Sequence, residues 1–404
     1  MNWKCVLALL LPLAANARET EIRIHNPIAI DRPDSVIKIK LADLLAPGEK
    51  PPAAWQVTQA EMPVPAQLFD NELVLLLNLA PNQERVVKVH PLPDGPEPRV
   101  ISRVQADLAI RVGGTEARSK EGQILFRGGE LKAVDSFTPR PDHWLHDGSV
   151  AHEGPGWESD RMAFRLYLDE RAVTDLFAKQ RPELVMHNVG RGSNYHALAD
   201  WGMDTLEVGD SLGAGSIGVL RDGMATQIGP HKSITATQIA NGPVIAGFDI
   251  KTREWSFEGK PYDLDARYTI AAGSRLTEIT GHAAPKLPMV AGIVKHKNMH
   301  VLLPKDPKGR AWNYLATWGN QALSGDADLQ GLVIFYPNDE IARTGDDDRS
   351  LYVLYAGSAK PFHFASGAAW SRELGGIINE AQFRKYLEDT AEALSHPLEV
   401  SVSF

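Results

Sequence analysis

Short runs of alternating apolar and polar residues recur along most of this sequence, and clusters of Pro, Gly and Asn separate them. Two clear examples are VIKIK at 36–40 and ERVVKV at 84–89. Alternation with a period of two places one set of side chains on each face of a β-strand, and the separating residues favour turns. The 34 glycines and 27 prolines supply such turns throughout the 404 residues. The sequence therefore predicts an all-β fold built from antiparallel sheets.

Three segments are expected along the chain. Residues 1–17, MNWKCVLALLLPLAANA, combine a positive Lys4, an apolar run and an Ala-Asn-Ala site, which is typical of a cleaved signal peptide and predicts a periplasmic or secreted protein. Residues 18–98 are expected to form a small β-sandwich that ends in the proline-rich PLPDGPEP at 91–98, which we interpret as a linker. Residues 99–404 are expected to form a large all-β domain.

Charge and cysteine content narrow the classes of function. The sequence has 42 Lys and Arg against 51 Asp and Glu, a formal net charge of -9, which is opposite in sign to a nucleic-acid-binding surface. We therefore expect no nucleic-acid partner. No apolar run reaches the roughly 18 to 20 residues of a membrane span, so none is expected. The single cysteine, Cys5, lies in the expected signal peptide, so neither a thiolate nucleophile nor a Cys-based zinc site is expected.

Further strands are expected in the large domain, and a short helix near the C-terminus. The strand-like runs lie at 104–112, 162–168, 233–239, 244–250, 267–270, 332–336 and 351–355. Asn379 is a suitable N-cap residue, with Gln382 three positions later, and Pro397 ends the helical pattern. The apolar positions with helical spacing are Phe383, Leu387, Ala391 and Leu394. The final LEVSVSF alternates again, so the C-terminus is expected to join a sheet.

Charged and aromatic residues gather around the expected strand at 162–168. Its apolar residues occupy even positions, so Arg165 and Tyr167 share the opposite face with Arg161. Arginine can hold a carboxylate through two parallel hydrogen bonds, so Arg161 and Arg165 are predicted to bind an acidic group of a substrate. Glu158, in the turn before the strand, is a further candidate for substrate contact. The alternative is an ordinary surface ion pair between Glu158 and Arg161.

The string NYHALADWGMD brings five candidate side chains together. Tyr195 and His196 are predicted as acid and base in a reaction on a sugar, with Asp200 in the catalytic set and Trp201 against the ring of the sugar. A second interpretation is a divalent cation held by His196, Asp200 and Asp204; otherwise no metal or cofactor is expected. A third is structural: Asp200 caps a turn, Trp201 lies in the core and His196 is only hydrogen-bonded.

Three further residues are candidates for substrate binding. Lys295 and His296 follow the apolar MVAGIV, at a strand end where a loop facing substrate is expected. Trp318 is predicted as a platform for a pyranose ring, with burial in the core as the alternative. The string SLGAGSIG at 211–218 has glycine spacing similar to that of a dinucleotide-binding loop. No helix is expected after it, so we interpret these glycines as sites of close backbone packing.

Several long strings occur in a characteristic order beyond residue 100: GPGWESDRMAFRLYLDERAVTDLFAK, YHALADWGMDTLEVGDSLGAG, NGPVIAGFDI, AAGSRLTEITGH and VAGIVKH. Together they resemble the bacterial family catalogued as domain of unknown function 4861, in which the DWG and GAG segments recur. The resemblance implies exported proteins of bacteria that digest plant or algal polysaccharides. It also implies a large antiparallel β-supersandwich of the galactose-mutarotase type, and a role beside enzymes for uronic-acid polymers such as pectin.

The first functional hypothesis is an exported enzyme that acts on uronic-acid-containing oligosaccharides by β-elimination. Arg161 or Arg165 would neutralise the carboxylate of the sugar, His196 would remove the adjacent proton, and Tyr195 or Tyr167 would protonate the leaving oxygen. A polysaccharide or oligosaccharide is the expected partner.

Three alternatives remain open at this point. A glycoside hydrolase would use two carboxylates, Glu158 with Asp200 or Asp204, on either side of a glycosidic bond. A sugar mutarotase or epimerase would use a His and a carboxylate without cleaving a chain. A glycan-binding module would hold sugar on Trp residues without turnover.

Overall fold

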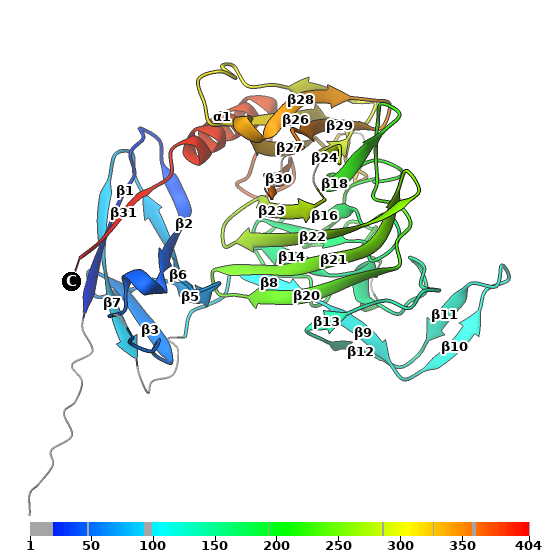
Figure 1. Ribbon diagram of the computed structural model, residues 1–404, viewed down its shortest axis with the longest axis horizontal. Helices are drawn as coiled ribbons and strands as arrows, with labels where there is room; N and C mark the ends of the chain where they lie inside the picture. The colour runs from blue at the N-terminus through cyan, green and yellow to red at the C-terminus, as the bar shows by residue number, and fades with distance from the viewer. Residues whose placement is uncertain are drawn as a thin grey trace, which may run out of the picture.

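Antiparallel β-strands dominate the computed structural model, which describes residues 19–46, 48–92, 99–192, 194–284, 287–325, 327–357 and 361–403. The predicted all-β fold with a short C-terminal helix is confirmed. Figure 1 shows a small unit beside a much larger one. The expected signal peptide, residues 1–17, lies outside the described residues.

The small unit is a sandwich of two antiparallel sheets with a core of its own. Its strands are β1 (Thr20–His25), β2 (Arg32–Lys40), β3 (Ala54–Gln59), β4 (Met62–Pro63), β5 (Ala66–Phe69), β6 (Glu72–Leu79), β7 (Glu84–Leu92) and β31 (Glu399–Ser403). One sheet has the order β31-β1-β7-β3-β4 and the other β2-β6-β5. Alternating side chains such as Ile22, Ile24 and Val87 fill the space between them.

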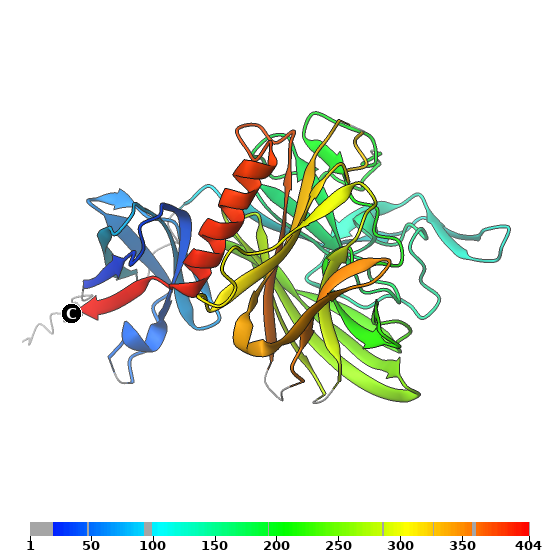
Figure 2. The same cartoon turned by 90° about the horizontal axis from the view of Figure 1, so that it is seen from above.

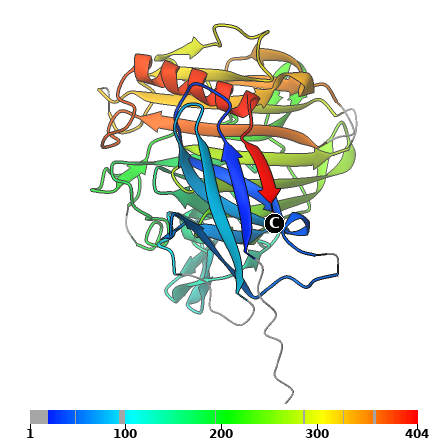
Figure 3. The same ribbon diagram turned by 90° about the vertical axis from the view of Figure 1, so that its left-hand side faces the viewer.

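The small unit includes residues beyond its expected core strands at two places, the end of β7 and the C-terminal strand β31. Strand β7 continues through Pro91 to Leu92, into the segment interpreted as a linker, because β3 pairs with it that far. The rest of that segment, 93–98, lies outside the described residues. Strand β31 pairs with β1, so the predicted sheet at the C-terminus is confirmed. Figures 2 and 3 show β31 leaving the helix and lying along β1.

The large unit is built on one nine-stranded antiparallel sheet. In spatial order its strands are β13 (Ser136–Phe137), β20 (Ser233–Asn241), β21 (Ile245–Phe257), β22 (Lys260–Ala271), β23 (Leu276–Ala283), β30 (Phe362–Trp370), β27 (Gln330–Pro337), β26 (Trp312–Gly319) and β25 (Met299–Leu302). The predicted runs at 233–239, 267–270 and 332–336 lie within these strands, and the run at 244–250 lies in β21 except for Val244.

Two five-stranded sheets cover one face of the nine-stranded sheet. The first has the order β17 (Gly202–Asp204), β16 (Thr174–Lys179), β15 (Met162–Leu166), β14 (Gly156–Ser159) and β8 (Val104–Asp107). The second has the order β19 (Met224–Thr226), β18 (Ala214–Arg221), β24 (Met289–Val294), β29 (Ser350–Tyr355) and β28 (Ile341–Asp346). All three sheets contribute to one apolar core, as a layered β-sandwich requires.

Helix α1 (Glu380–Ser395) packs on the other face of the nine-stranded sheet. Along β26 the odd-numbered Leu315 faces the main core, whereas Trp318 faces the helix, 5.2 Å from the ring of Phe383. The side chain of Asn379 accepts a hydrogen bond from the Gln382 backbone, which confirms the predicted N-cap. The helix joins the large unit to β31 and therefore to the small unit (Figure 2).

Two hairpins extend from the large unit (Figure 1). They are β9 (Ala109–Val112) with β12 (Glu130–Ala133), and β10 (Thr115–Arg118) with β11 (Ile124–Arg127). The prediction of a single strand at 104–112 is wrong, because the chain leaves the sheet of β8 at Leu108 and enters the first hairpin. Short 3-10 turns occur at Leu41–Asp43, Ala151–Glu153 and Asn338–Glu340. No helix in the described ranges has the length and apolar character needed to cross a bilayer.

The glycine-rich run at 211–218 leads directly into β18, and no helix follows it. A Cβ atom on Gly213, whose φ is +52°, would lie 2.2 Å from the carbonyl oxygen of Thr174. A Cβ on Gly218 would lie 2.5 Å from the carbonyl oxygen of Thr226. These glycines let neighbouring chain segments approach closely, as predicted from the sequence.

Candidate active site

Three neighbouring strands bring charged side chains to one place on the outer face of the first five-stranded sheet. Arg165 of β15 lies directly opposite Asp175 of β16 in the antiparallel register. Asp204 of β17 lies opposite Phe177, two residues further along β16. The even-numbered residues of β15 enter the main core, so Arg165 and Asp175 lie together on the other face.

The chain between β16 and β17 folds back and covers this outer face. Its apolar residues Val185, Met186 and Val189 pack against Phe177, and Tyr195 and Trp201 lie at the edge of the same cluster. As a result, the Arg165 side chain is only 1% exposed. A guanidinium group so deeply buried has to be paired and hydrogen-bonded within the protein.

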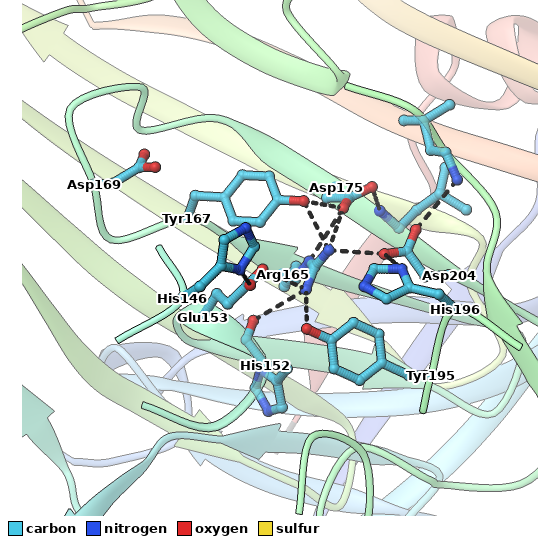
Figure 4. A network of polar contacts seen from close by, with 12 residues as sticks. His146, His152, Glu153, Arg165, Tyr167, Asp169, Asp175, Tyr195, His196 and Asp204 are labelled. Atoms are coloured by element: carbon cyan, nitrogen blue, oxygen red, sulfur yellow. Dashed lines mark hydrogen bonds and ion pairs between the residues drawn. The ribbon is translucent and has the colours of Figure 1, made fainter. Parts of the chain in front are cut away.

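Arg165 binds three carboxylates (Figure 4). Its Nε and Nη2 atoms donate to Oδ2 of Asp175 at 3.1 and 2.7 Å, and Nη2 also donates to Oδ2 of Asp204 at 2.8 Å. Its Nη1 atom donates to Oε2 of Glu153 at 3.0 Å. We call these four residues the Arg165 cluster. With one positive group among three acids, the cluster favours additional protons nearby.

Two tyrosine hydroxyls complete the shell around Arg165, and their protons differ in availability. Tyr167 accepts from Nη2 of Arg165 at 2.7 Å and donates its own proton to Asp175 at 2.5 Å. Tyr195 accepts from Nη1 of Arg165 at 3.2 Å, and its ring lies edge-on to Phe177. Burial raises the pKa of both hydroxyls, so each stays protonated near neutral pH.

Two exposed histidines stand at the edge of the Arg165 cluster, each beside one of its carboxylates. The Nδ1 atom of His196 lies 3.3 Å from Oδ2 of Asp204, and the imidazole is 57% exposed. The Nδ1 atom of His146 lies 2.8 Å from Oε1 of Glu153, and this imidazole is 64% exposed. Both carboxylates are also bound by Arg165. The second ring nitrogen of each histidine is left for contacts outside the cluster.

Two groups of the site, His196 and Asp175, have raised pKa values. The hydrogen bond with Asp204 raises the pKa of His196, against the opposing effect of partial burial. Burial, together with the negative charge of Asp204, raises the pKa of Asp175 to about 6. Groups with shifted pKa values around an accessible imidazole are typical of sites of proton transfer.

The backbone that carries Glu153 is strained. His152 and Glu153 have φ values of +36° and +68°, in the left-handed region that residues other than glycine rarely adopt. The Nε2 atom of His152 lies 3.0 Å from Asp107, which also binds Arg191 at 2.8 and 2.9 Å. A Cβ on Gly190 would lie 2.5 Å from the backbone nitrogen of His152. The conformation that directs Glu153 toward Arg165 is therefore held by packing and by ion pairs.

The structure brings some of the predicted site residues together and separates others. Tyr195 and His196 lie at the Arg165 cluster (Figure 4). Arg165 also lies there, although its burial leaves no donor for the carboxylate of a substrate, so the predicted substrate contact is wrong. The proton of Tyr167 is committed to Asp175, which does not suit the predicted acid role. Arg161 is separate: it pairs with Glu373 at 3.4 Å, near Arg275.

Glu158 is buried rather than exposed to substrate. Its carboxylate pairs with the ammonium group of Lys179 and accepts hydrogen bonds from the backbone nitrogens of Val185 and Met186. The side chain has no exposed surface. The predicted contact between Glu158 and a substrate is therefore wrong, because the carboxylate fastens the covering segment to the sheet.

The DWG segment forms a turn beside the cluster. Asp200 is exposed at this turn, and Trp201 is half-buried with its ring 6.3 Å from that of Phe177. Gly202, with φ at +140°, approaches β16 so closely that a Cβ would lie 1.9 Å from the carbonyl oxygen of Ala178. The catalytic role of Asp200 and the contact of Trp201 with a sugar stay predictions.

The remaining candidates lie elsewhere. Lys295 pairs with Asp346 at 2.5 Å, and His296 lies 3.0 Å from the carbonyl oxygen of Glu207. Trp318 is buried beneath α1, which corresponds to the core alternative rather than to a sugar platform. Across the residues that the structure describes, no three His, Cys, Asp or Glu side chains are arranged to hold a metal. The interpretation of His196, Asp200 and Asp204 as ligands therefore lacks its geometry.

Three members of the site were absent from the sequence-based prediction of its catalytic and binding residues: His146, Glu153 and Asp175. Asp175 stands directly before the apolar residues Leu176, Phe177 and Ala178, and a carboxylate in such a position indicates a buried partner. His146 and Glu153 belong to a stretch rich in His and acidic residues, but the contact of Glu153 with Arg165 depends on two left-handed residues that no local pattern indicates.

Comparison with known proteins identifies relatives of this chain. The family profile described as Domain of unknown function (DUF4861) matches residues 24–400. A protein of Formosa agariphila called "Uncharacterized protein P7" is 26% identical over 273 residues, which cover 61% of this chain and 66% of that protein.

Two solved structures from Enterococcus faecalis are similar over 96% of this chain, at 10% identity. They are an alpha-mannosidase, with a TM-score of 0.44, and a protein in the Glycosyl Hydrolase Family 38, with a TM-score of 0.43. This chain covers 46% and 47% of their lengths, so it spans less than half of either. At these scores neither structure bears on the function of this chain.

Proposed function

The chain belongs to the DUF4861 family, and from the Arg165 cluster we propose that it is an exported carbohydrate-active enzyme that acts on uronic-acid-containing oligosaccharides by β-elimination. One observation carries the proposal: two exposed imidazoles, His146 and His196, are each held by a carboxylate bound to the same buried guanidinium. This arrangement supports proton transfer. The substrate class rests on the carbohydrate role that the family resemblance implies.

We assign His196 as the general base. Asp204 lies beside its Nδ1 atom, which leaves Nε2 to take a proton from a substrate. Tyr195 is the general acid, because its hydroxyl accepts from Arg165 and keeps its own proton available. Arg165 also stabilises the phenolate that forms when that proton leaves. Arg165 and Asp204 are thus positioning residues that touch no substrate.

The carboxylate of the sugar needs a hydrogen-bonding partner, and buried Arg165 does not supply it. We assign this role to the exposed imidazole of His146, whose Nδ1 atom is held by Glu153 at 2.8 Å. A hydrogen bond from His146 to the carboxylate makes the C5 proton of the uronate more acidic. His196 takes that proton, its electron pair forms the C4–C5 double bond, the C4–O bond breaks, and Tyr195 protonates the leaving oxygen.

A hydrolase built on the predicted carboxylate pair is less well supported. Glu158 is occupied by Lys179 and two backbone nitrogens, and Asp204 is occupied by Arg165. Acid and base carboxylates of a glycosidase have to flank the scissile bond. Neither Glu158 nor Asp204 has the exposed surface for that position.

The second candidate function is sugar mutarotation or epimerisation. The pairing of two imidazoles in one site favours it, since these reactions need one acid and one base and leave the bonds between sugar residues intact. The two candidates share His196 as a proton-transfer group and differ in their products.

Incubation with pectic, alginate and glucuronan oligomers tests the proposal. β-Elimination increases ultraviolet absorbance, because each cleavage creates an unsaturated uronate. His196→Ala should abolish the increase. The matched control is His300→Ala, since His300 of β25 is 53% exposed and pairs with Glu380 of α1 at 2.6 Å. If no oligomer of the panel gives an absorbance change, the lyase is overturned. Faster anomeric exchange in NMR would then identify the second candidate. New reducing ends without an absorbance change would identify a hydrolase.

A further inference from the structure

A cavity of about 410 Å³ lies beside the Arg165 cluster. Its walls come from residues 139–141 and 143–145, from the turn at 168–170 and from residues 230–234, which lead into β20. The first wall continues directly into His146, and the second follows Tyr167. Figure 4 shows Asp169, which lines the cavity, on the same side of the cluster as His146 and Tyr167. One end of the cavity therefore adjoins the site of the proposed reaction.

Trp144 connects the cavity with the catalytic site. Its half-buried ring lines the cavity, and the ring centroid lies 5.5 Å from that of His146 in an edge-on arrangement. The indole nitrogen donates to the carbonyl oxygen of Ile124 at 2.6 Å, so the ring orientation is fixed. A fixed aromatic face beside polar groups suits a pyranose ring, which has apolar patches and a polar rim.

His143 supplies a second, independent sign of a ligand. It lines the cavity, its side chain is 6% exposed, and its Nδ1 atom is held by Asp147 at 2.6 Å. Its Nε2 atom is buried and has no hydrogen-bond partner in the part of the chain that the structure describes. Buried polar atoms are normally satisfied, so this unpaired nitrogen, in a residue that lines the cavity, indicates a partner beyond the described chain.

We propose that this cavity is a subsite for the sugar residue next to the one that reacts, so that the enzyme acts on oligosaccharides rather than on monosaccharides. The neighbouring ring stacks on Trp144, beside the part of the cavity wall that carries His143. The cavity volume falls within the range of small-molecule pockets, about 300 to 1,000 Å³. Arg140 and Lys232 at the cavity wall suit an acidic sugar, although both also pair with protein carboxylates. The identity of the ligand rests on the proposed function.

Binding of galacturonate oligomers, from one to four residues, tests the subsite by calorimetry without turnover. The background variant is His196→Ala, which removes the proposed base. In this background we expect affinity to increase with chain length. Adding Trp144→Ala should raise the Kd for the tetramer about tenfold, the equivalent of one lost aromatic stacking contact, and change the Kd for the monomer less than twofold. Trp144→Phe, which keeps a ring, should restore most of the affinity.

Trp312→Ala is the matched control. Trp312 is another half-buried indole in edge-on contact with a histidine, at 4.9 Å from His363, and it does not line the cavity. It should leave oligomer binding unchanged. Binding that is independent of chain length, no binding of any oligomer, or equal losses in the Trp144 and Trp312 variants overturns the subsite. Chain-length-dependent binding that needs Trp144, without turnover by the wild type, supports the subsite and overturns the lyase.

Discussion

The Nδ1 atom of His196 lies 3.3 Å from Oδ2 of Asp204, and the two side chains differ sharply in exposure, at 57% and 2%. The imidazole faces solvent while its carboxylate is fixed inside the protein by Arg165. A proton acceptor at the surface is thus oriented by a charge that water does not screen. In this site the exposed groups are the ones that can react, and the buried groups hold them in position.

Replacing His196 by Ala should lower turnover about 10²- to 10⁴-fold, the usual contribution of a general base. Because the imidazole is more than half exposed, thermal unfolding should change little. Initial rates on an active oligomer and a melting curve measure the two effects. His300→Ala, which removes an equally exposed paired histidine, should retain full activity. A large loss of melting temperature with His196→Ala would indicate a structural role instead.

The pH profile of kcat/KM should report the raised pKa of His196. A base works only when deprotonated, so activity should increase as pH rises through a value above the ordinary 6.5 of histidine. Asp204→Asn removes the carboxylate whose hydrogen bond and charge raise this pKa, so it should move the rising limb to lower pH. NMR titration of the His196 ring in both proteins checks the assignment without turnover. If the rising limb does not move in the Asp204→Asn variant, it reports the pKa of a group other than His196.

Arg165→Met should destabilise the protein by about 3 to 5 kcal/mol, because it leaves three buried carboxylates without their shared cation. Urea unfolding measures the change. Arg161→Ala is the control, four residues earlier: its partner Glu373 keeps a second partner in Arg275, so the loss should stay below about 1 kcal/mol. Similar losses in the two variants would contradict the central role of Arg165.

Glu158→Gln should lower the free energy of unfolding. The folded fraction of the variant should bind substrate with an unchanged KM. The substitution leaves the ammonium group of Lys179 unpaired in a fully buried position, at a cost of about 3 to 5 kcal/mol. The control is Glu254→Gln, which breaks an exposed pair with Lys232 and should cost less than about 1 kcal/mol. A raised KM with unchanged stability would return Glu158 to the substrate-binding set.

Sequence patterns predict those parts of the site that depend on strand alternation. The period of two in MAFRLYL places Arg165 and Tyr167 on one face. The pairing of β15 with β16, and of β16 with β17, then brings Asp175 and Asp204 to that face. Alternation says nothing of what covers that face. The covering chain between β16 and β17 turns an expected substrate-binding arginine into a buried one.

Residues that meet only through long-range folding escape the sequence-based prediction. Arg161 shares the face of Arg165 by alternation, yet Glu373, more than two hundred residues later, decides its partner. Glu153 reaches Arg165 through two consecutive left-handed residues, His152 and Glu153 itself, neither of which is a glycine. Such conformations are fixed by surrounding packing and not by local preference.

The pairing of β1 with β31 has a consequence for the order in which the chain assembles. Strand β1 is made early, but one edge of it is covered only by residues near 400. Synthesis at about 5 to 20 residues per second leaves that edge bare for on the order of tens of seconds. A bare strand edge is a template for pairing with other chains. The small sandwich is therefore complete only when β31 has paired with β1. Until then, a chaperone that binds the bare edge of β1 would prevent its pairing with other chains.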